Sequence, residues 1–176
     1  MAVVNRLKDN QNINEAWQKF VGSGSIERGI LTSTIHDSWI RSYNLNIDPH
    51  SDVVEKELGP EALKTRMEVL RWMLRIAKPF LETLFLTVGD MGFVVRFTDA
   101  DGYVLASFGE ESVFENNKSL HLFKGTNVSE DAIGTNAIGI SIKKKIPVQV
   151  MGSEHYRKIY HQWTSSAAPI KDDQGE

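Results

Sequence analysis

The sequence predicts an α+β fold, in which helices and antiparallel strands occupy separate stretches of the chain. Three observations indicate this. A helical period extends over residues 60–88, a period of two begins at residue 93, and short apolar strands at 146–151 and 163–170 follow a further helix. With 176 residues, of which 41% are hydrophobic, the chain is long enough for one globular domain with a core and some flanking helix.

Residues 1–59 are predicted to form an N-terminal helical region. The stretch 11–45 has the pattern of two helices, of which the first is capped by Asn14 and ends at Gly22-Ser23-Gly24-Ser25. The second helix, within ILTSTIHDSWIRSYN, places three side chains on one face: Ile35, Trp39 and Ser42.

Residues 60–88 give the longest helical signal. An apolar seam recurs with alternating steps of four and three at Leu63, Met67, Leu70, Leu74, Ala77, Leu81, Leu84 and Val88. A second apolar row lies beside it at Val69, Met73, Ile76 and Phe80. One row can cover a sheet while the other meets a second copy, so we expect a homodimer through helix 60–88. The alternative is a single helix buried on both sides within one domain.

The second half of the chain alternates strands with shorter helices. FVVRFTDADGYVLASFG, from residue 93, predicts a hairpin whose Gly102 can adopt a left-handed conformation. Ser129 is expected to begin one helix that runs to about Lys144, with Glu130 and Asp131 in its first turn. Residues 153–162 are expected to be a short helix or helical loop. The final DDQGE repeats the Asp-x-x-Gly of the hairpin turn, so we interpret the sequence as a fragment that stops before a further strand.

Composition excludes several classes of protein. The longest apolar runs are too short to span a bilayer, and the N-terminus lacks a signal-peptide core, which predicts a cytoplasmic location and no membrane partner. The absence of cysteine excludes disulfides, thiolate metal sites and a thiol nucleophile. With 20 basic and 23 acidic residues, the chain lacks the basic excess of a nucleic-acid module. The run Lys143-Lys144-Lys145 is interpreted as the solvated end of a helix.

The stretch EDAIGTNAIGIS comes close to a phosphate-binding loop. Gly134 and Gly139 have the required spacing, but Ile140 occupies the position where a lysine would reach the terminal phosphates. The glycines also fall inside the predicted helix. Their interpretation is therefore close packing of that helix against a sheet.

Neither metal binding nor catalysis has a motif in this sequence. The five histidines include no H-E-x-x-H pair, so no metal and no other cofactor is expected. Ser165 and Ser166 could pair with His155 or His161, but no G-x-S-x-G elbow frames them, so no catalytic residue is assigned. An ordered metal, or a Ser–His hydrogen bond inside a cleft, would favour an enzyme.

The stretch GSEHYRKIYHQWTSSAAPI is rich in groups that suit a small-molecule pocket. Aromatic rings offer apolar walls with polar tips, and a few hydroxyl, amide and imidazole groups offer hydrogen bonds. The candidate ligand contacts are Thr135, Asn136, His155, Tyr156, Trp163 and Ser165. The alternative, that these aromatics close the core over the sheet, stays open.

Five motifs make the combination recognisable, in the order DSWIRS, FTDADGYVLASFG, SEDAIGTNAIG, IPVQVMGSEHY and WTSSAAPIKDDQG. Together they resemble the N-terminal sensory region of sigma-54-dependent transcriptional activators of the acetoin-catabolism regulator type, with the dihydroxyacetone-kinase operon activators as close relatives. The resemblance covers nearly the whole chain. It implies a GAF domain, with an antiparallel sheet of about five or six strands flanked by helices, at residues 60–176 and truncated before the last strand.

The resemblance also implies a function. A non-enzymatic sensor would bind a small-molecule effector of the acetoin type and control an attached AAA+ ATPase and a DNA-binding domain. The longer protein would contact DNA and sigma-54 RNA polymerase, whereas this chain would not. The alternative is a module that binds a protein partner, as in the dihydroxyacetone-kinase operon activators. Relatives often carry a cysteine where Ser165 stands, so thiol redox sensing is excluded here.

Overall fold

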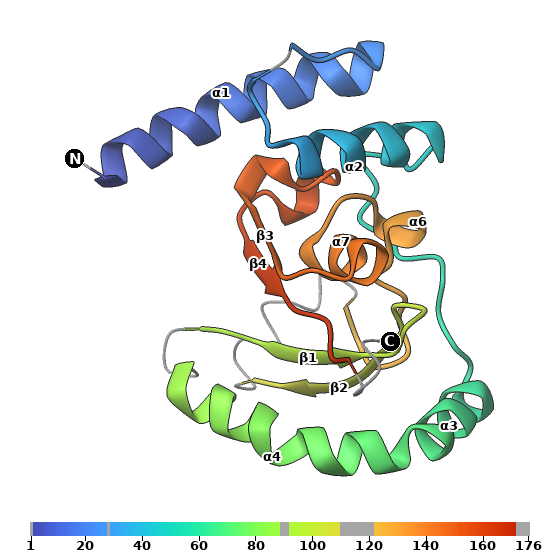
Figure 1. The fold of residues 1–176 in the computed structure, drawn as a ribbon. Coiled ribbons are helices and arrows are strands. Elements are labelled where there is room, and N and C mark those ends of the chain that lie inside the picture. Colours follow the sequence, from blue (N-terminus) through green and yellow to red (C-terminus); the bar gives the residue numbers. More distant parts are fainter. Residues whose placement is uncertain (1, 28, 89–91, 110–121, 172–176) are drawn as a thin grey trace. The chain divides into compact units, whose positions relative to one another are not determined.

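The computed structural model describes residues 2–27, 29–88, 92–109 and 122–171 (Figure 1). Its contacts divide the chain into two compact units. The terminal unit combines Met1–Ser51 with Ser129–Glu176, and the central unit is Asp52–Val128. These units do not coincide with the predicted division at residue 60, and that division stays a prediction about domains.

The terminal unit is built from helices around one pair of strands. Strand β3 (Val148–Met151) pairs antiparallel with β4 (Thr164–Ala167), in a register that joins Val148 to Ala167 and Met151 to Thr164. The helical elements are α1 (Ala2–Ser23), α2 (Ser33–Asn44), α6 (Glu130–Ile133), α7 (Ala137–Lys144) and the 3-10 turns η3 (Gly152–Glu154) and η4 (Lys158–Tyr160).

The core of the terminal unit is aromatic. The buried rings of Trp17, Phe20, Trp39 and Tyr156 lie in one cluster, with Phe20 5.2 Å from Trp39 between ring centroids. Trp17 donates from Nε1 to the carbonyl oxygen of Tyr156 at 2.8 Å, which satisfies its only polar group. α1 ends at Ser23 as expected, but it begins at Ala2, so Asn14 lies inside the helix and does not cap it.

The predicted single helix from Ser129 to Lys144 is wrong, because the chain breaks at Gly134. That glycine has φ of 75°, and Asn136 then caps α7 by accepting a hydrogen bond from the Gly139 amide at 2.9 Å. A Cβ on Gly134 would lie 2.8 Å from Cβ of Tyr156, and one on Gly139 would lie 2.7 Å from the Glu130 amide nitrogen. The glycines therefore serve close packing, but against Tyr156 and α6.

The central unit places two helices on a hairpin. α3 (Pro60–Val69) and α4 (Arg71–Val88) are separated only at Leu70, which confirms most of the predicted helix 60–88. Strands β1 (Val95–Thr98) and β2 (Val104–Phe108) form the predicted hairpin, and α4 contacts both of them (Figure 1). Gly102 has φ of 90°, as its turn requires.

The hairpin turn is fixed by Asp99. Its side chain accepts hydrogen bonds from the amides of Asp101 at 3.0 Å and Tyr103 at 2.8 Å, and Arg66 of α3 donates to it at 2.6 Å. Arg66 also lies 4.5 Å from the centre of the Tyr103 ring. One arginine thus attaches α3 to the turn.

The mixed helix-and-strand architecture is confirmed, but the strand count is not. Within the described residues, four strands form two separate antiparallel pairs, β1–β2 and β3–β4. Each pair belongs to a different compact unit, and each is hydrogen-bonded within itself. A single sheet of five or six strands stays a prediction.

Candidate functional site

A buried ion pair joins α2 to the first turn of α6 in the terminal unit. Arg41 donates from Nε to Glu130 Oε2 at 2.9 Å and from Nη2 to Glu130 Oε1 at 2.7 Å, a geometry in which the planar guanidinium meets both carboxylate oxygens. Glu130 is only 6% exposed, and Ser38 donates a further hydrogen bond to Oε1. These donors compensate the cost of removing the carboxylate from water.

Three buried hydroxyl groups extend this ion pair into a network. Ser38 Oγ lies 2.8 Å from Thr135 Oγ1, which lies 3.2 Å from Ser42 Oγ. Ser42 donates in turn to the Ser38 carbonyl oxygen at 2.9 Å. Thr135, a predicted ligand contact, therefore has partners inside the protein. Glu130 and Ser38 are 92 residues apart in the chain, so the network ties the motif DSWIRS to the motif SEDAIGTNAIG.

The side chain of Asn136 is also used internally. Its Oδ1 accepts from the Gly139 amide at 2.9 Å, and its Nδ2 donates to the Gly134 carbonyl oxygen at 2.9 Å. Both ends of the amide thus hold the junction between α6 and α7. Asn136 is 6% exposed, so its observed role is to cap α7.

His155 and Ser165 form a hydrogen-bonded pair. His155 Nδ1 lies 2.9 Å from the Gly152 carbonyl oxygen, so Nδ1 carries the proton, and Nε2 accepts from the Ser165 hydroxyl at 2.8 Å. Burial lowers the pKa of His155 from 6.5 to about 4. A histidine with this pKa is neutral near pH 7 and is a poor general base for a serine.

The burial and the low pKa of His155 are unfavourable for catalysis by this pair. His155 is 2% exposed, and the pocket described below lies in the other unit. A Ser–His hydrogen bond is thus present, and neither residue lines the pocket described below.

Tyr156 and Trp163 differ in how their polar groups are used. Tyr156 is 1% exposed, its ring packs against Gly134, and burial raises the pKa of its hydroxyl to about 12. Trp163 is half-buried, and its buried Nε1–H has no acceptor among the described residues. An acceptor on a bound molecule would satisfy that group, since an unpaired buried donor is costly.

The structure thus brings some of the six predicted contacts together. His155 contacts Ser165 directly, and the Tyr156 amide donates to the Thr135 carbonyl oxygen at 3.2 Å. Their role in ligand binding stays a prediction. The sequence analysis missed the network of Ser38, Arg41 and Glu130. The available signal was a single basic residue, Arg41 in DSWIRS, and the acidic pair Glu130-Asp131 in SEDAIGTNAIG.

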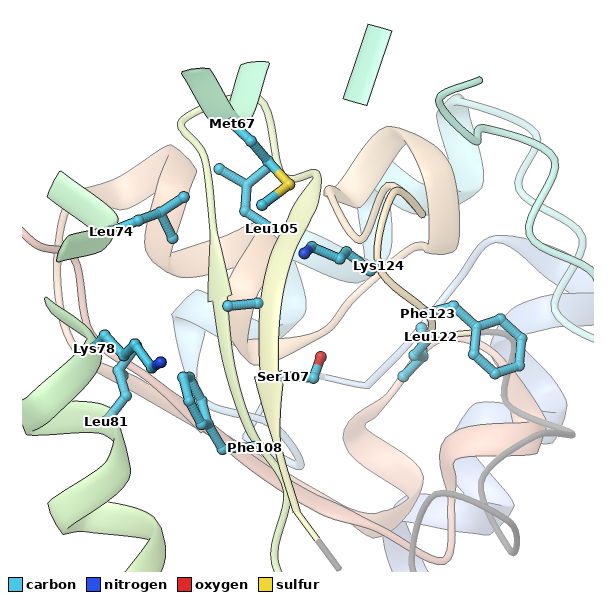
Figure 2. Close-up of a pocket in the computed structure, with 11 residues that line it drawn as sticks. Met67, Leu74, Lys78, Leu81, Leu105, Ser107, Phe108, Leu122, Phe123 and Lys124 are labelled. Atoms are coloured by element: carbon cyan, nitrogen blue, oxygen red, sulfur yellow. The ribbon is translucent and has the colours of Figure 1, made fainter. Parts of the chain in front are cut away.

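The central unit contains a pocket that the sequence analysis did not predict. Its volume is about 480 Å³, within the usual range for small-molecule sites. It lies beside α3, α4, strand β2 and the segment that follows the hairpin (Figure 2). Its lining residues are Met67, Leu74, Lys78, Leu81, Leu105, Ala106, Ser107, Phe108, Leu122, Phe123 and Lys124.

The polar groups of this central pocket are few. Lys78 comes from α4 and Lys124 from the segment after the hairpin, and Figure 2 shows their amino groups turned toward the strands. Ser107 lies on β2, and its buried Oγ has no hydrogen-bond partner among the described residues. The pocket therefore combines apolar walls with two cations and one buried hydroxyl that has no partner among the described residues.

The opposite side of α4 carries an exposed apolar row. Trp72 is 61% exposed, Ile76 58% and Phe80 72%, and these three residues define the α4 row. Ile76 follows Leu74 by two residues and is thus rotated by about 200° around the helix from the pocket side. Of the second row predicted from sequence, Ile76, Phe80 and Val69 are exposed, whereas Met73 packs on the hairpin core. Leu84 of the first row is 50% exposed, so the division between a covered and an uncovered face follows the prediction only in part.

The described part of the chain contains neither a candidate metal site nor a candidate membrane span. Within residues 2–27, 29–88, 92–109 and 122–171, no group of three or more histidine or acidic side chains could hold a metal ion. His121, one of the five histidines, lies outside these residues. In the same part of the chain, no helix has the length and apolar character needed to cross a bilayer.

Comparison with known proteins identifies relatives along nearly the whole chain. Residues 9–175 match the family described as "MimR, N-terminal domain". The acetoin dehydrogenase operon transcriptional activator AcoR of Bacillus subtilis is 33% identical over 92% of this chain and 27% of its own length. The propane 2-monooxygenase operon transcriptional activator MimR of Mycolicibacterium smegmatis is 26% identical over 89% of this chain and 26% of its own length.

A solved structure shares the fold. The crystal structure of the E. coli DhaR(N)–DhaL complex contains a chain that matches with a TM-score of 0.78 and 20% identity, over 82% of this chain and 49% of that one. The chain spans about a quarter of the length of the two relatives above. The similarity therefore concerns one regulatory part of larger proteins.

Proposed function

Because this chain belongs to the family of MimR N-terminal domains, a regulatory region of AcoR- and MimR-type transcriptional activators, we propose that it senses a small metabolite. Binding of that metabolite would control an ATPase and a DNA-binding domain elsewhere in a longer protein. The chain itself would act as a regulatory domain, because its relatives are transcriptional regulators.

One observation carries the proposal: the two sides of α4 have different surroundings. One side of this helix lines the central pocket through Leu74, Lys78 and Leu81. The other side carries the exposed α4 row of Trp72, Ile76 and Phe80. If the pocket binds its ligand more tightly when α4 is in one of two positions, the ligand increases the population of that position. The contacts made by the α4 row would then change as well.

The α4 row is proposed to pair with a second copy of the chain. A row of large apolar side chains more than half exposed is costly to leave in water, and a symmetric dimer would cover it. In that arrangement, a change in α4 would alter the spacing of the domains attached to each subunit.

The six residues predicted from sequence remain a second proposed location for the ligand. Trp163 and Ser165 are the two that are half-buried, and Trp163 has the buried donor without an acceptor among the described residues. Thr135, Asn136, His155 and Tyr156 would then shape the walls of the site.

A thermal-shift screen of small metabolites tests the proposal. A compound that binds only the folded chain raises its melting temperature, by an amount that grows with the logarithm of its concentration relative to its Kd. Ser107→Phe fills the central pocket, and Trp163→Phe removes only the indole donor at the second location. Loss of the shift in one variant and not the other assigns the ligand to that location, and either outcome supports the proposal.

A protein partner is the alternative function. The DhaR(N)–DhaL complex shows that a protein of this fold binds another protein, and the α4 row offers an apolar surface for such a contact. If no metabolite shifts the melting temperature, while a purified DhaL-type protein binds and Phe80→Ser abolishes that binding, the metabolite proposal is wrong.

A further inference from the structure

We propose that the central pocket binds a small amphipathic anion, a carboxylate attached to an apolar chain. This inference rests on the proposed sensing function and names the chemical class of the ligand. It starts from the walls of the pocket. Leu74 and Leu81 of α4, Leu105 and Phe108 of β2 and Met67 of α3 present hydrocarbon groups, which favour an apolar ligand body.

The charges of the pocket determine the sign of the ligand. Lys78 and Lys124 are its only charged lining residues in the described part of the chain, and both are cations. Two cations near an apolar cavity attract an anion and repel a second cation. A carboxylate or similar head group beside one of them would keep its charge compensated while its chain enters the apolar part of the pocket.

Neither lysine is firmly engaged elsewhere. Lys78 Nζ lies 3.6 Å from Glu82 Oε1, but the two side chains are 63% and 48% exposed. An ion pair this exposed contributes little, so a ligand can replace it. Lys124 is exposed, and none of the described residues forms an ion pair with it.

Ser107 supplies the third polar group. Its buried Oγ lies in the lining of the pocket and has no partner among the described residues. A hydroxyl that can donate to a carboxylate oxygen is expected to be paired when buried, and a ligand would provide the acceptor. Figure 2 shows this oxygen on the strand between the two lysine side chains.

Isothermal titration of the 176-residue chain with octanoate, and with 1-octanol as the neutral equivalent, tests the inference. Octanoate is expected to bind at least about tenfold more tightly than 1-octanol, since only the carboxylate can contact the lysines. Its affinity is expected to fall as salt is raised from about 0.05 to 0.5 M, because exposed charges are screened. Equal affinity for the two compounds would overturn the inference, and so would no binding of octanoate.

Matched variants separate the site from general charge effects. Lys124→Met and Lys78→Met are each expected to weaken octanoate binding by about fivefold, and the double variant by more. Lys64→Met removes an exposed lysine of α3 outside the pocket and should leave binding unchanged. Glu82→Gln releases Lys78 and should strengthen binding, an effect that a purely structural role of Lys78 would not produce. If Lys64→Met weakens binding as much as Lys124→Met, the inference is wrong.

Failure of this inference differs from failure of the proposed function. If a neutral metabolite from the thermal-shift screen binds and Ser107→Phe abolishes its binding, the sensor proposal stands and the anionic class is wrong. If neither octanoate nor any screened metabolite binds, both proposals fail.

Discussion

The terminal unit and the central unit use their polar groups in different ways. In the terminal unit these groups are mostly bound to one another, as shown by Glu130 with Arg41 and by His155 with Ser165. In the central unit, Ser107 Oγ lacks a partner among the described residues, a pocket borders α4, and the α4 row is exposed.

The difference shows what the family motifs encode. Four of the five motifs behind the resemblance lie in the terminal unit, where their polar residues build the fold's own hydrogen bonds. A shared motif of this kind specifies how a unit is held together. The described pocket and the exposed α4 row belong to the central unit, whereas the terminal unit keeps Trp163 Nε1 as a buried donor without an acceptor among the described residues.

Removing the carboxylate of Glu130 should have the largest effect. Glu130→Ala leaves the half-buried guanidinium of Arg41 without its acceptor and removes one of the two partners of the Ser38 hydroxyl. We expect a loss of about 3 kcal/mol in the free energy of unfolding. This is the lower end of the range for a broken buried ion pair, because Arg41 remains partly exposed to solvent. Urea unfolding followed by circular dichroism measures this change.

The control is the neighbouring carboxylate. Asp131 is exposed and occupies the same first turn of α6, so Asp131→Ala removes an equal charge near the same helix end. We expect that variant to lose at most about 1 kcal/mol, the usual size of a helix-end charge effect. Equal losses for the two variants would show that the network does not hold the terminal unit together.

The pH dependence of stability should show the next largest effect, through His155. Burial lowers the pKa of His155 from 6.5 to about 4, so between these values the unfolded chain binds a proton that the folded chain does not. Stability is therefore complete above about pH 6.5 and decreases as the pH falls toward 4, by about 3 kcal/mol in total.

The comparison of wild type with His155→Gln isolates this contribution. Burial also lowers the pKa of His161, which acts in the same direction, and raises the pKa of Glu154, which acts in the opposite one. Both groups remain in the variant. The stability difference between the two proteins should thus shrink as the pH falls from 6.5 to 4, as measured by urea unfolding at each pH. A constant difference would mean that His155 does not titrate as its burial implies.

The sequence predicted individual elements better than their assembly. The hairpin with Gly102 and the face of Ile35, Trp39 and Ser42 follow from local periodicity, and the structure confirms them. It also confirms most of the helix 60–88, which is divided into α3 and α4 at Leu70. The single helix through Gly134 was wrong. Hydrophobic periodicity does not reveal a single glycine with positive φ, such as Gly134. Asn136, in contrast, is a residue type that commonly caps helices and could have indicated the start of α7.

The site was harder to predict, because its chemistry depends on contacts between distant residues. Aromatic density indicated a pocket around Tyr156, but Tyr156 packs on Gly134 within the core. The central pocket depends on how α4 packs against β2, which no local sequence pattern specifies. In the same way, the sequence around Ser107 does not reveal that its hydroxyl is buried without a partner among the described residues. The uncovered side of α4 was predictable, because two apolar rows on one helix exceed what one sheet can cover.

The smallest effect on folding, and the sharpest test of the central unit, concerns the α4 row. Phe80 is 72% exposed, so Phe80→Ser should leave the free energy of unfolding of the isolated subunit nearly unchanged. If the row pairs with a second copy, the same change should weaken self-association by about tenfold or more, since a buried aromatic ring contributes strongly to an interface. Sedimentation equilibrium over a range of concentrations measures this.

Leu86→Ser is the matched control for the α4 row. Leu86 is 82% exposed on the same helix, but it lies six residues, about 9 Å along the helix axis, beyond Phe80 and thus past the end of the row. We expect this variant to self-associate like the wild type. If the wild-type chain stays monomeric at high concentration, with and without ligand, the proposed dimer is wrong. The α4 row would then be a candidate surface for a protein partner. A dimer that Leu86→Ser and Phe80→Ser weaken equally would place the contact elsewhere on α4.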